Sequence, residues 1–299
     1  MLIDMSAITD FKSGLSLAKS KVLTFFLAII GIVVVLGLAF VLVTLPIGLI
    51  AWMIDPSADF ITRWTDTLVA WTLPLTSGSV EVILSISFLA VILPIAAIGI
   101  WVLGALFGIA KEQIDTNDTR VEHAFSWLRK KFVPLIIGGI LLSIVIFLPA
   151  LVVGYVISWA YGFGTIPYPI NWIEGIIGFV YFFIMLGFFS LLCPAIIDDT
   201  SPLDAMKKSF RIVRANLGRI FGFLLIFVII ASILFGPIAI YSMYLVSLGL
   251  TPDPMTDVVF AALTAWSAIG AFILLLFVVP TLIFGLTLIY NSLKSTPNA

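Results

Sequence analysis

The chain has 299 residues, of which 62% are apolar and only 10% are charged, and its mean hydropathy is +1.25. A soluble domain is about half apolar, so this composition excludes a soluble globular protein and favours helices that cross a bilayer. The net charge is −1, and the single cysteine excludes an intrachain disulfide and a cysteine-based metal site.

Apolar runs along the whole chain predict one polytopic, all-α membrane domain over residues 1–299, with six transmembrane helices. A membrane span needs roughly 20 residues, and every run is at least that long. The first run is too long for the apolar part of a cleavable signal peptide, so we expect it to remain as a span. The runs cover about 22–53, 80–110, 132–161, 173–197, 220–248 and 258–290.

The basic residues predict how these spans are oriented. Of the 15 lysines and arginines, all except Arg63 lie in the N-terminal segment, the second and fourth connections or the C-terminal tail. Connections on the cytoplasmic side of a membrane protein carry the excess of lysine and arginine. We therefore expect a multi-pass protein of the cell (cytoplasmic) membrane with both termini in the cytoplasm.

Three stretches align without gaps and predict a threefold internal repeat. They read GLSLAKSKVLTFF (Gly14–Phe26), AFSWLRKKFVPLI (Ala124–Ile136) and SFRIVRANLGRIF (Ser209–Phe221). Each carries a cation at its sixth position and then enters an odd-numbered span. The similarity is also what a shared topology would impose on composition, so common origin and common constraint are both open.

Prolines and acids recur in the same order within this unit. Each odd span carries a proline in its outer part, and each even span opens near an acid, where a helix dipole favours negative charge. We expect a repeat of helix plus hairpin, made of a basic amphipathic helix, a span, an acidic turn and a returning span. The residues are Pro46, Pro149 and Pro237, and Glu81, Glu174 and Asp257.

The third of the three cytoplasmic amphipathic interfacial helices is predicted in most detail. Ser201 is placed to cap it, with Pro202 in the first turn and Asp204 three residues after the cap. Its apolar positions fall within one arc, which would rest on the span bundle or on hydrocarbon chains. These positions are Leu203, Met206, Phe210, Val213 and Leu217.

The basic faces of the three helices are the candidate binding surface, and anionic phospholipids are the expected partner. Two other interpretations stay open, namely that the cations only orient the chain, and that they bind a membrane or cytoplasmic protein. Nucleic acid is excluded as a partner because the cations are few and match no recognised motif. The candidate residues are Lys19, Arg129, Lys130, Lys207, Lys208, Arg211, Arg214 and Arg219.

Two segments carry a family resemblance. Leu191–Phe223, LLCPAIIDDTSPLDAMKKSFRIVRANLGRIFGF, and Pro280–Lys294, PTLIFGLTLIYNSLK, resemble a large family of six-span prokaryotic proteins. That family is similar to the membrane domain fused to some bacterial glycerophosphodiester phosphodiesterases. The resemblance implies the fold and the membrane location, but no enzyme activity, because the catalytic barrel of those enzymes is a separate domain. Asn291 stands where the family usually has aspartate.

The residues that could act in catalysis are better explained by a structural role. His123 beside Glu122 is interpreted as a solvated interface histidine, Cys193 as a buried thiol, and Asp198 with Asp199 as a helix start more than a carboxylate pair. The sequence carries no motif of nucleotide hydrolysis or metal catalysis. We therefore expect no enzyme activity, no catalytic or metal-binding residues and no cofactor.

Two functions remain at this stage. The first is a non-enzymatic membrane protein whose basic interfacial helices contact anionic lipid or a partner protein. The alternative is a channel or permease-like transporter component, which predicts a polar cavity near Pro94, Pro194 and Pro280. Of these prolines, Pro94 and Pro280 could break their spans. The GALFG motif at Gly104–Gly108 instead indicates close helix packing.

Overall fold

The structure is a computed structural model that describes residues 5–54, 59–62, 66, 86–117, 120–160, 170–198, 200–247 and 257–294. Within these residues the fold is all-helical and contains no strand. The long helices follow the six predicted apolar runs. They are α2 (Val22–Ile54), α5 (Ile86–Thr116), α7 (Phe132–Ala160), α8 (Ile170–Phe188), α11 (Leu217–Ser247), and α12 (Val258–Ile273) continuing into α13 (Val279–Leu293).

In the described part of the chain, five helical segments are long and apolar enough to cross a membrane. A sixth is added if α1 (Met5–Ser20) and the start of α2, which meet at a bend of 80°, count as one broken span. The predicted all-α membrane fold is therefore confirmed at the level of helices and their apolar character.

Short helices precede three of the long ones, as the aligned stretches predicted. These are α1, α6 (Val121–Lys130) and α10 (Pro202–Ala215). Each ends at a single non-helical residue, after which a long helix begins; the three residues are Lys21, Lys131 and Asn216. All three stand at the eighth position of their aligned stretch.

Burial repeats in the same register. The first, fifth and twelfth positions of each stretch are buried in all three copies, because these positions turn toward the bundle on either side of the break. The residues are Gly14, Ala124 and Ser209 at the first position, Ala18, Leu128 and Val213 at the fifth, and Phe25, Leu135 and Ile220 at the twelfth. The three stretches thus share both a break and a packing pattern.

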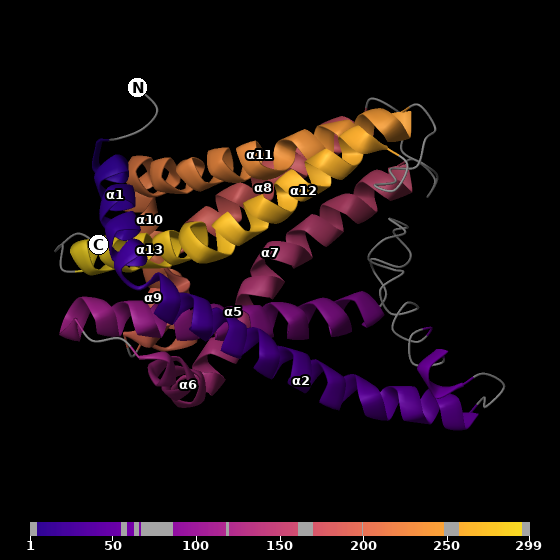
Figure 1. The fold of residues 1–299 in the computed structure, drawn as a ribbon, viewed down its shortest axis with the longest axis horizontal. Coiled ribbons are helices and arrows are strands. Elements are labelled where there is room, and N and C mark those ends of the chain that lie inside the picture. The colour runs from indigo at the N-terminus through magenta and orange to yellow at the C-terminus, as the bar shows by residue number, and fades with distance from the viewer. Residues whose placement is uncertain are drawn as a thin grey trace.

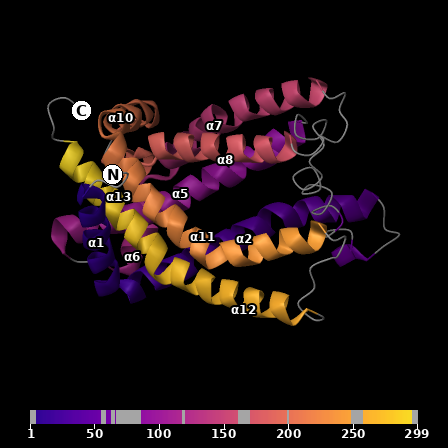
Figure 2. The same cartoon turned by 90° about the horizontal axis from the view of Figure 1, so that it is seen from above.

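The short helices gather at one end of the bundle, which we call the short-helix end. Figure 1 shows α1, α6 and α10 there together with the C-terminal end of α13, while the long helices extend away from them. Seen from above, the same helices remain grouped at that end (Figure 2). Helix α1 lies so close to α13 that a Cβ added at Gly14 would be 2.8 Å from the Thr281 carbonyl oxygen.

The cap of α10 is confirmed, and the members of its predicted apolar arc lie in two different environments. Ser201 Oγ accepts a hydrogen bond of 3.3 Å from the Asp204 amide, with Pro202 at the helix start. The face that packs on the bundle is made of Ala205, Met206, Ser209, Ile212 and Val213. Ala205 and Ser209 are small residues within this face. The Ser209 hydroxyl also donates a 2.8 Å hydrogen bond to the Phe188 carbonyl oxygen.

As a result, only two members of the predicted arc, Met206 and Val213, are buried. Leu203 and Phe210 remain exposed, at 53% and 42% of their surface. Leu217 lies beyond α10, at the first residue of α11, and is also exposed.

The fourth predicted span, 173–197, agrees with an apolar helical segment long enough to cross a membrane at Gly175–Ile197, although the helix is interrupted within it. Helix α8 ends at Phe188, three turn residues follow, and the short helix α9 (Leu192–Ile197) completes the segment. Pro194 has no amide hydrogen to give to the preceding turn. In that turn the amide and the hydroxyl of Ser190 both donate to the Gly187 carbonyl oxygen. Every residue of α9 is buried.

Prolines act differently in the other spans. The π-helix η1 (Leu274–Val278) ends just before Pro280, so a wider turn accommodates the missing amide of that proline. Helix α5 continues through Pro94. Of the two breaks considered from the sequence, a helical irregularity therefore occurs at Pro280 and the helix is unbroken at Pro94.

The glycine motif of α5 is confirmed as a close helix contact and supports a first prediction. A Cβ added at Gly108 would clash with the Trp127 ring of α6, and one at Gly104 would clash with Leu135 of α7. Gly108→Ala should therefore destabilise the fold by about 1–3 kcal/mol through overpacking. Thermal unfolding in detergent measures this.

Gly99→Ala is the matched control, because Gly99 lies on the same helix with nothing within 4 Å of its added Cβ. Equal unfolding temperatures for the two variants would contradict the packing assigned to Gly108.

Candidate functional site

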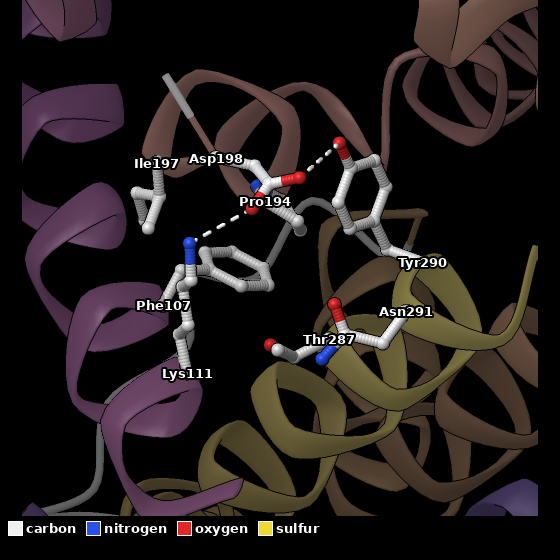
Figure 3. A pocket seen from close by; sticks show the side chains of 8 residues that line it. All are labelled: Phe107, Lys111, Pro194, Ile197, Asp198, Thr287, Tyr290 and Asn291. Atoms are coloured by element: carbon white, nitrogen blue, oxygen red, sulfur yellow. Dashed lines mark hydrogen bonds and ion pairs between the residues drawn. The ribbon is translucent and has the colours of Figure 1, made fainter. Parts of the chain in front are cut away.

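A carboxylate at the short-helix end joins three separate parts of the chain. Asp198 follows the last residue of α9, and its Oδ1 accepts a 2.8 Å hydrogen bond from Lys111 Nζ on α5. Lys294 Nζ, just beyond α13, lies 3.2 Å from Asp198 Oδ2. The Tyr290 hydroxyl of α13 donates to the same oxygen at 3.3 Å. Figure 3 shows the Lys111 and Tyr290 interactions from opposite sides of the carboxylate.

A fourth segment, α10, joins this group through Lys208. Its Nζ donates a 2.8 Å hydrogen bond to the Tyr290 hydroxyl and lies 5.0 Å from the centre of the tyrosine ring. The hydroxyl therefore accepts from Lys208 while it donates to Asp198. We call Lys111, Asp198, Lys208, Tyr290 and Lys294 the Asp198 cluster; it brings three ammonium groups around one described carboxylate.

The cluster holds Asp198 in its ionised form. Partial burial of Asp198 opposes ionisation, but the hydrogen bonds and positive charges of Lys111 and Lys294 outweigh it and lower the pKa of the carboxyl group. A small cavity of about 10 Å³ lies against the cluster and is also lined by Phe107 and Thr287. That volume is about enough for a single water molecule.

A much larger cavity, of about 450 Å³, lies farther into the bundle. We call it the apolar cavity, because Ser190 and Cys193 are the lining residues with polar side-chain atoms and all the others are apolar. Its walls come from α5, α7, α8, α9, α11 and α13. Phe107 lines both this cavity and the small one beside Asp198.

The eight candidate cations do not share one environment. Six are exposed at the short-helix end, namely Lys19, Arg129, Lys130, Lys207, Arg211 and Arg214. Among these, Lys130 lies 5.1 Å from the Trp127 ring centre and Lys207 lies 4.0 Å from Asp204. The remaining two, Lys208 and Arg219, are engaged inside the protein.

Arg219 anchors the first short helix to α11. Its Nε and Nη2 donate hydrogen bonds of 2.6 and 2.8 Å to the two carboxylate oxygens of Asp10 on α1. Asp10 is 8% exposed, so this bidentate pair is largely shielded from water. The sequence interpretation gave Arg219 a lipid or partner contact, whereas the structure directs its guanidinium to an internal carboxylate.

The other residues considered for chemistry have structural surroundings. His123 Nδ1 lies 2.9 Å from Glu112 Oε2, a contact without hydrogen-bond alignment, so the histidine is half-buried beside α5 and is not the solvated residue expected. Cys193 is buried, as predicted. Asp257 caps α12, accepting from the amides of Val259 and Phe260. Asp199 and Glu81 lie outside the described residues.

Sequence reasoning missed three members of the Asp198 cluster, namely Lys111, Tyr290 and Lys294. They are 87, 92 and 96 residues from Asp198, so no spacing rule relates them to it. The available signal was their position at the ends of predicted spans, where charged and tyrosine side chains from different helices meet at one membrane surface.

Many long apolar helices and a charged end define the chain as a multi-pass membrane protein. Within that class, the sequence profile of a family described as a domain of unknown function (DUF7847) matches residues 5–293, and the chain belongs to this family. Comparisons with curated proteins and with solved structures gave no match. The function is therefore argued from the geometry.

A second prediction concerns Asp198 and pH. Because the pKa of the folded-state carboxyl group is lowered, its interactions stabilise the fold above the unfolded pKa of about 4 and are lost as pH falls through the folded value. Asp198→Asn should cost about 1–3 kcal/mol at pH 7, since it weakens bonds to partly buried lysines.

Thermal unfolding across pH measures this, and the difference between the variant and the original chain should shrink below about pH 4. Asp115→Asn, at an exposed position of α5, is the control. A difference of the same size at pH 7 and pH 3 would rule out the assigned role.

A third prediction concerns the Asp10–Arg219 pair. A double-mutant cycle with Asp10→Asn and Arg219→Gln should give a coupling of about 1.5–3 kcal/mol, typical of hydrogen bonds to charged groups. Arg219→Lys should recover only part of it, because an ammonium cannot form the two parallel bonds of a guanidinium. Additive single-variant effects in thermal unfolding would show that the pair does not hold α1.

Proposed function

We propose that the protein is a non-enzymatic multi-pass protein of the cell membrane, and that its short-helix end lies in the cytoplasm. In this proposal the chain crosses the bilayer six times. The exposed cations of α1, α6 and α10 contact the headgroups of anionic phospholipids. A membrane or cytoplasmic protein that carries negative charge would use the same surface.

One observation carries this proposal: the six exposed cations gather around the end of an apolar body. The long helices carry large exposed apolar side chains on their flanks, such as Val33 at 60%, Ile177 at 61% and Ile233 at 60%. Apolar side chains on these flanks favour contact with lipid hydrocarbon. The six exposed cations at the adjoining end would then lie at the depth of the headgroups. Each cation near an anionic leaflet contributes about 1 kcal/mol.

Helix α10 supports the same arrangement in detail. Five of its exposed residues, Leu203, Lys207, Phe210, Arg211 and Arg214, fall within an arc of about 100° at the helical period, and the exposed Asp204 and Ala215 lie beside that arc. Apolar anchors and cations on one exposed face are typical of a helix that lies in the membrane interface. Leucine and phenylalanine would enter the hydrocarbon boundary while the cations reach the phosphates.

The repeated break and burial pattern supports a threefold repeat in which each unit presents one basic helix. The resemblance to the phosphodiesterase-associated membrane domains stays a prediction. It agrees with a role outside catalysis, since those domains accompany a separate catalytic barrel.

A channel or permease is the second candidate function, and the apolar cavity is the observation that favours it. The cavity lies near two of the three prolines named for it, since Cys193 and Val279 line it beside Pro194 and Pro280. Its lining differs from the polar surface that was expected. An apolar lining suits hydrocarbon and disfavours a hydrated ion, so lipid contact is the better-supported function.

A fourth prediction tests the lipid contact through the exposed cations of α10. Lys207→Gln, Arg211→Gln and Arg214→Gln together should lower the preference for anionic lipid by up to about 3 kcal/mol, at about 1 kcal/mol per charge. Native mass spectrometry of the full chain from nanodiscs with equal phosphatidylglycerol and phosphatidylcholine measures the retained lipids.

The matched control conserves charge, with Lys207→Arg, Arg211→Lys and Arg214→Lys, and should retain the original lipid ratio. An unchanged ratio of retained phosphatidylglycerol to phosphatidylcholine in the glutamine variant would contradict the proposed contact. The same loss in both variants would show that side-chain shape, and not charge, decides binding.

A further inference from the structure

The apolar cavity and the Asp198 cluster are continuous along three of the same helices. On α5, Phe107 lines both spaces and Lys111 follows one helical turn later. On α13, Leu286 lines the apolar cavity, and the next residue, Thr287, lines the small one. In α9, Cys193 lines the apolar cavity and the next residue, Pro194, lines the small one. The protein thus places an apolar space directly behind a charged one.

Size and lining define what the apolar cavity accepts. The apolar cavity is half open to the outside of the bundle, and its volume is about 450 Å³. Water gains too few partners there, since Ser190 already donates its hydroxyl to the Gly187 carbonyl oxygen. A flexible hydrocarbon chain fits both the volume and the lining.

The charge of the Asp198 cluster defines which ligand group can bind at the short-helix end. The Asp198 cluster holds three ammonium groups against one described carboxylate, and all its ion pairs are partly buried, with side-chain exposures of 24% to 34%. Lysines that are partly removed from water attract an anion more strongly than exposed ones do. An anionic group at the short-helix end therefore complements this excess.

From these two ends together, we infer that the bundle holds one anionic membrane phospholipid at a specific site. One hydrocarbon chain occupies the apolar cavity, and the phosphate lies at the Asp198 cluster, next to Lys111 and Lys294. Phe107 lies where chain and headgroup meet; its ring is beside the Lys111–Asp198 ion pair in Figure 3. This inference rests on the proposed function in taking the short-helix end to face headgroups.

The experiment uses the purified full chain in detergent, with dioleoylphosphatidylglycerol, dioleoylphosphatidylcholine and oleate as probes. Native mass spectrometry should show one phosphatidylglycerol retained per chain, and phosphatidylglycerol should raise the unfolding temperature more than phosphatidylcholine does. Lys294→Gln should lower the preference for phosphatidylglycerol about fivefold, as expected for one cation.

Ala231→Phe on α11 fills the apolar cavity and should reduce retained lipid about tenfold or more, because a well-packed space rejects added volume. Ala239→Phe, at an exposed position of the same helix, is the control and should retain it. Val228→Phe fills the same cavity from a second position, in case Ala231→Phe does not fold.

Unchanged retention in both cavity-filling variants would overturn the inference. Equal retention of the two phospholipids would overturn the headgroup assignment, and an equal effect of oleate would replace the phospholipid with a free fatty acid. Glutamine at Lys207, Arg211 and Arg214 should leave this one lipid in place. The glutamine variant therefore tests the proposed surface contact, and the cavity-filling variants test the single-lipid site, so that failure of one is distinguishable from failure of the other.

Discussion

The Asp198 carboxylate is the interaction on which the short-helix end depends. It binds a lysine from α5 and a lysine beyond α13, and through Tyr290 it reaches Lys208 of α10. Charged groups are costly in hydrocarbon, so these partners satisfy one another where the helices leave the apolar region. The cluster thereby fixes the ends of α5, α9 and α13 relative to one another, and the Asp10–Arg219 pair attaches α1 to the same assembly.

Packing away from that end has a different physical basis. Inside a bilayer, helices gain little from burying apolar surface and associate by close van der Waals fit. Gly104 and Gly108 provide such a fit, since their missing side chains admit Leu135 and Trp127. Elsewhere the apolar cavity lies among residues of α5, α8, α11 and α13. In the site inferred above, this cavity holds one hydrocarbon chain.

Much of the fold could be predicted, because each feature had a local signal. Runs of apolar residues located the long helices, Ser201 and Asp257 marked helix starts, and the aligned stretches marked where a short helix precedes a long one. The face of α10 that packs on the bundle was predicted only in part, because the apolar arc counted large apolar residues and passed over Ala205 and Ser209. The fourth span was located correctly, but the turn within it was not predicted, because hydropathy alone does not register the turn before Pro194.

The sequence by itself determined a helical membrane protein, its apolar runs and the gathering of positive charge on alternate connections, since these follow from composition and from contacts between near neighbours. Only the tertiary structure decided which charges are exposed and which are paired within the protein. It separated Lys208 and Arg219 from the other candidate cations and brought Lys111, Tyr290 and Lys294 to Asp198. The physical reason is distance along the chain: partners about 90 residues apart are chosen by how helices pack, and no local pattern records that choice.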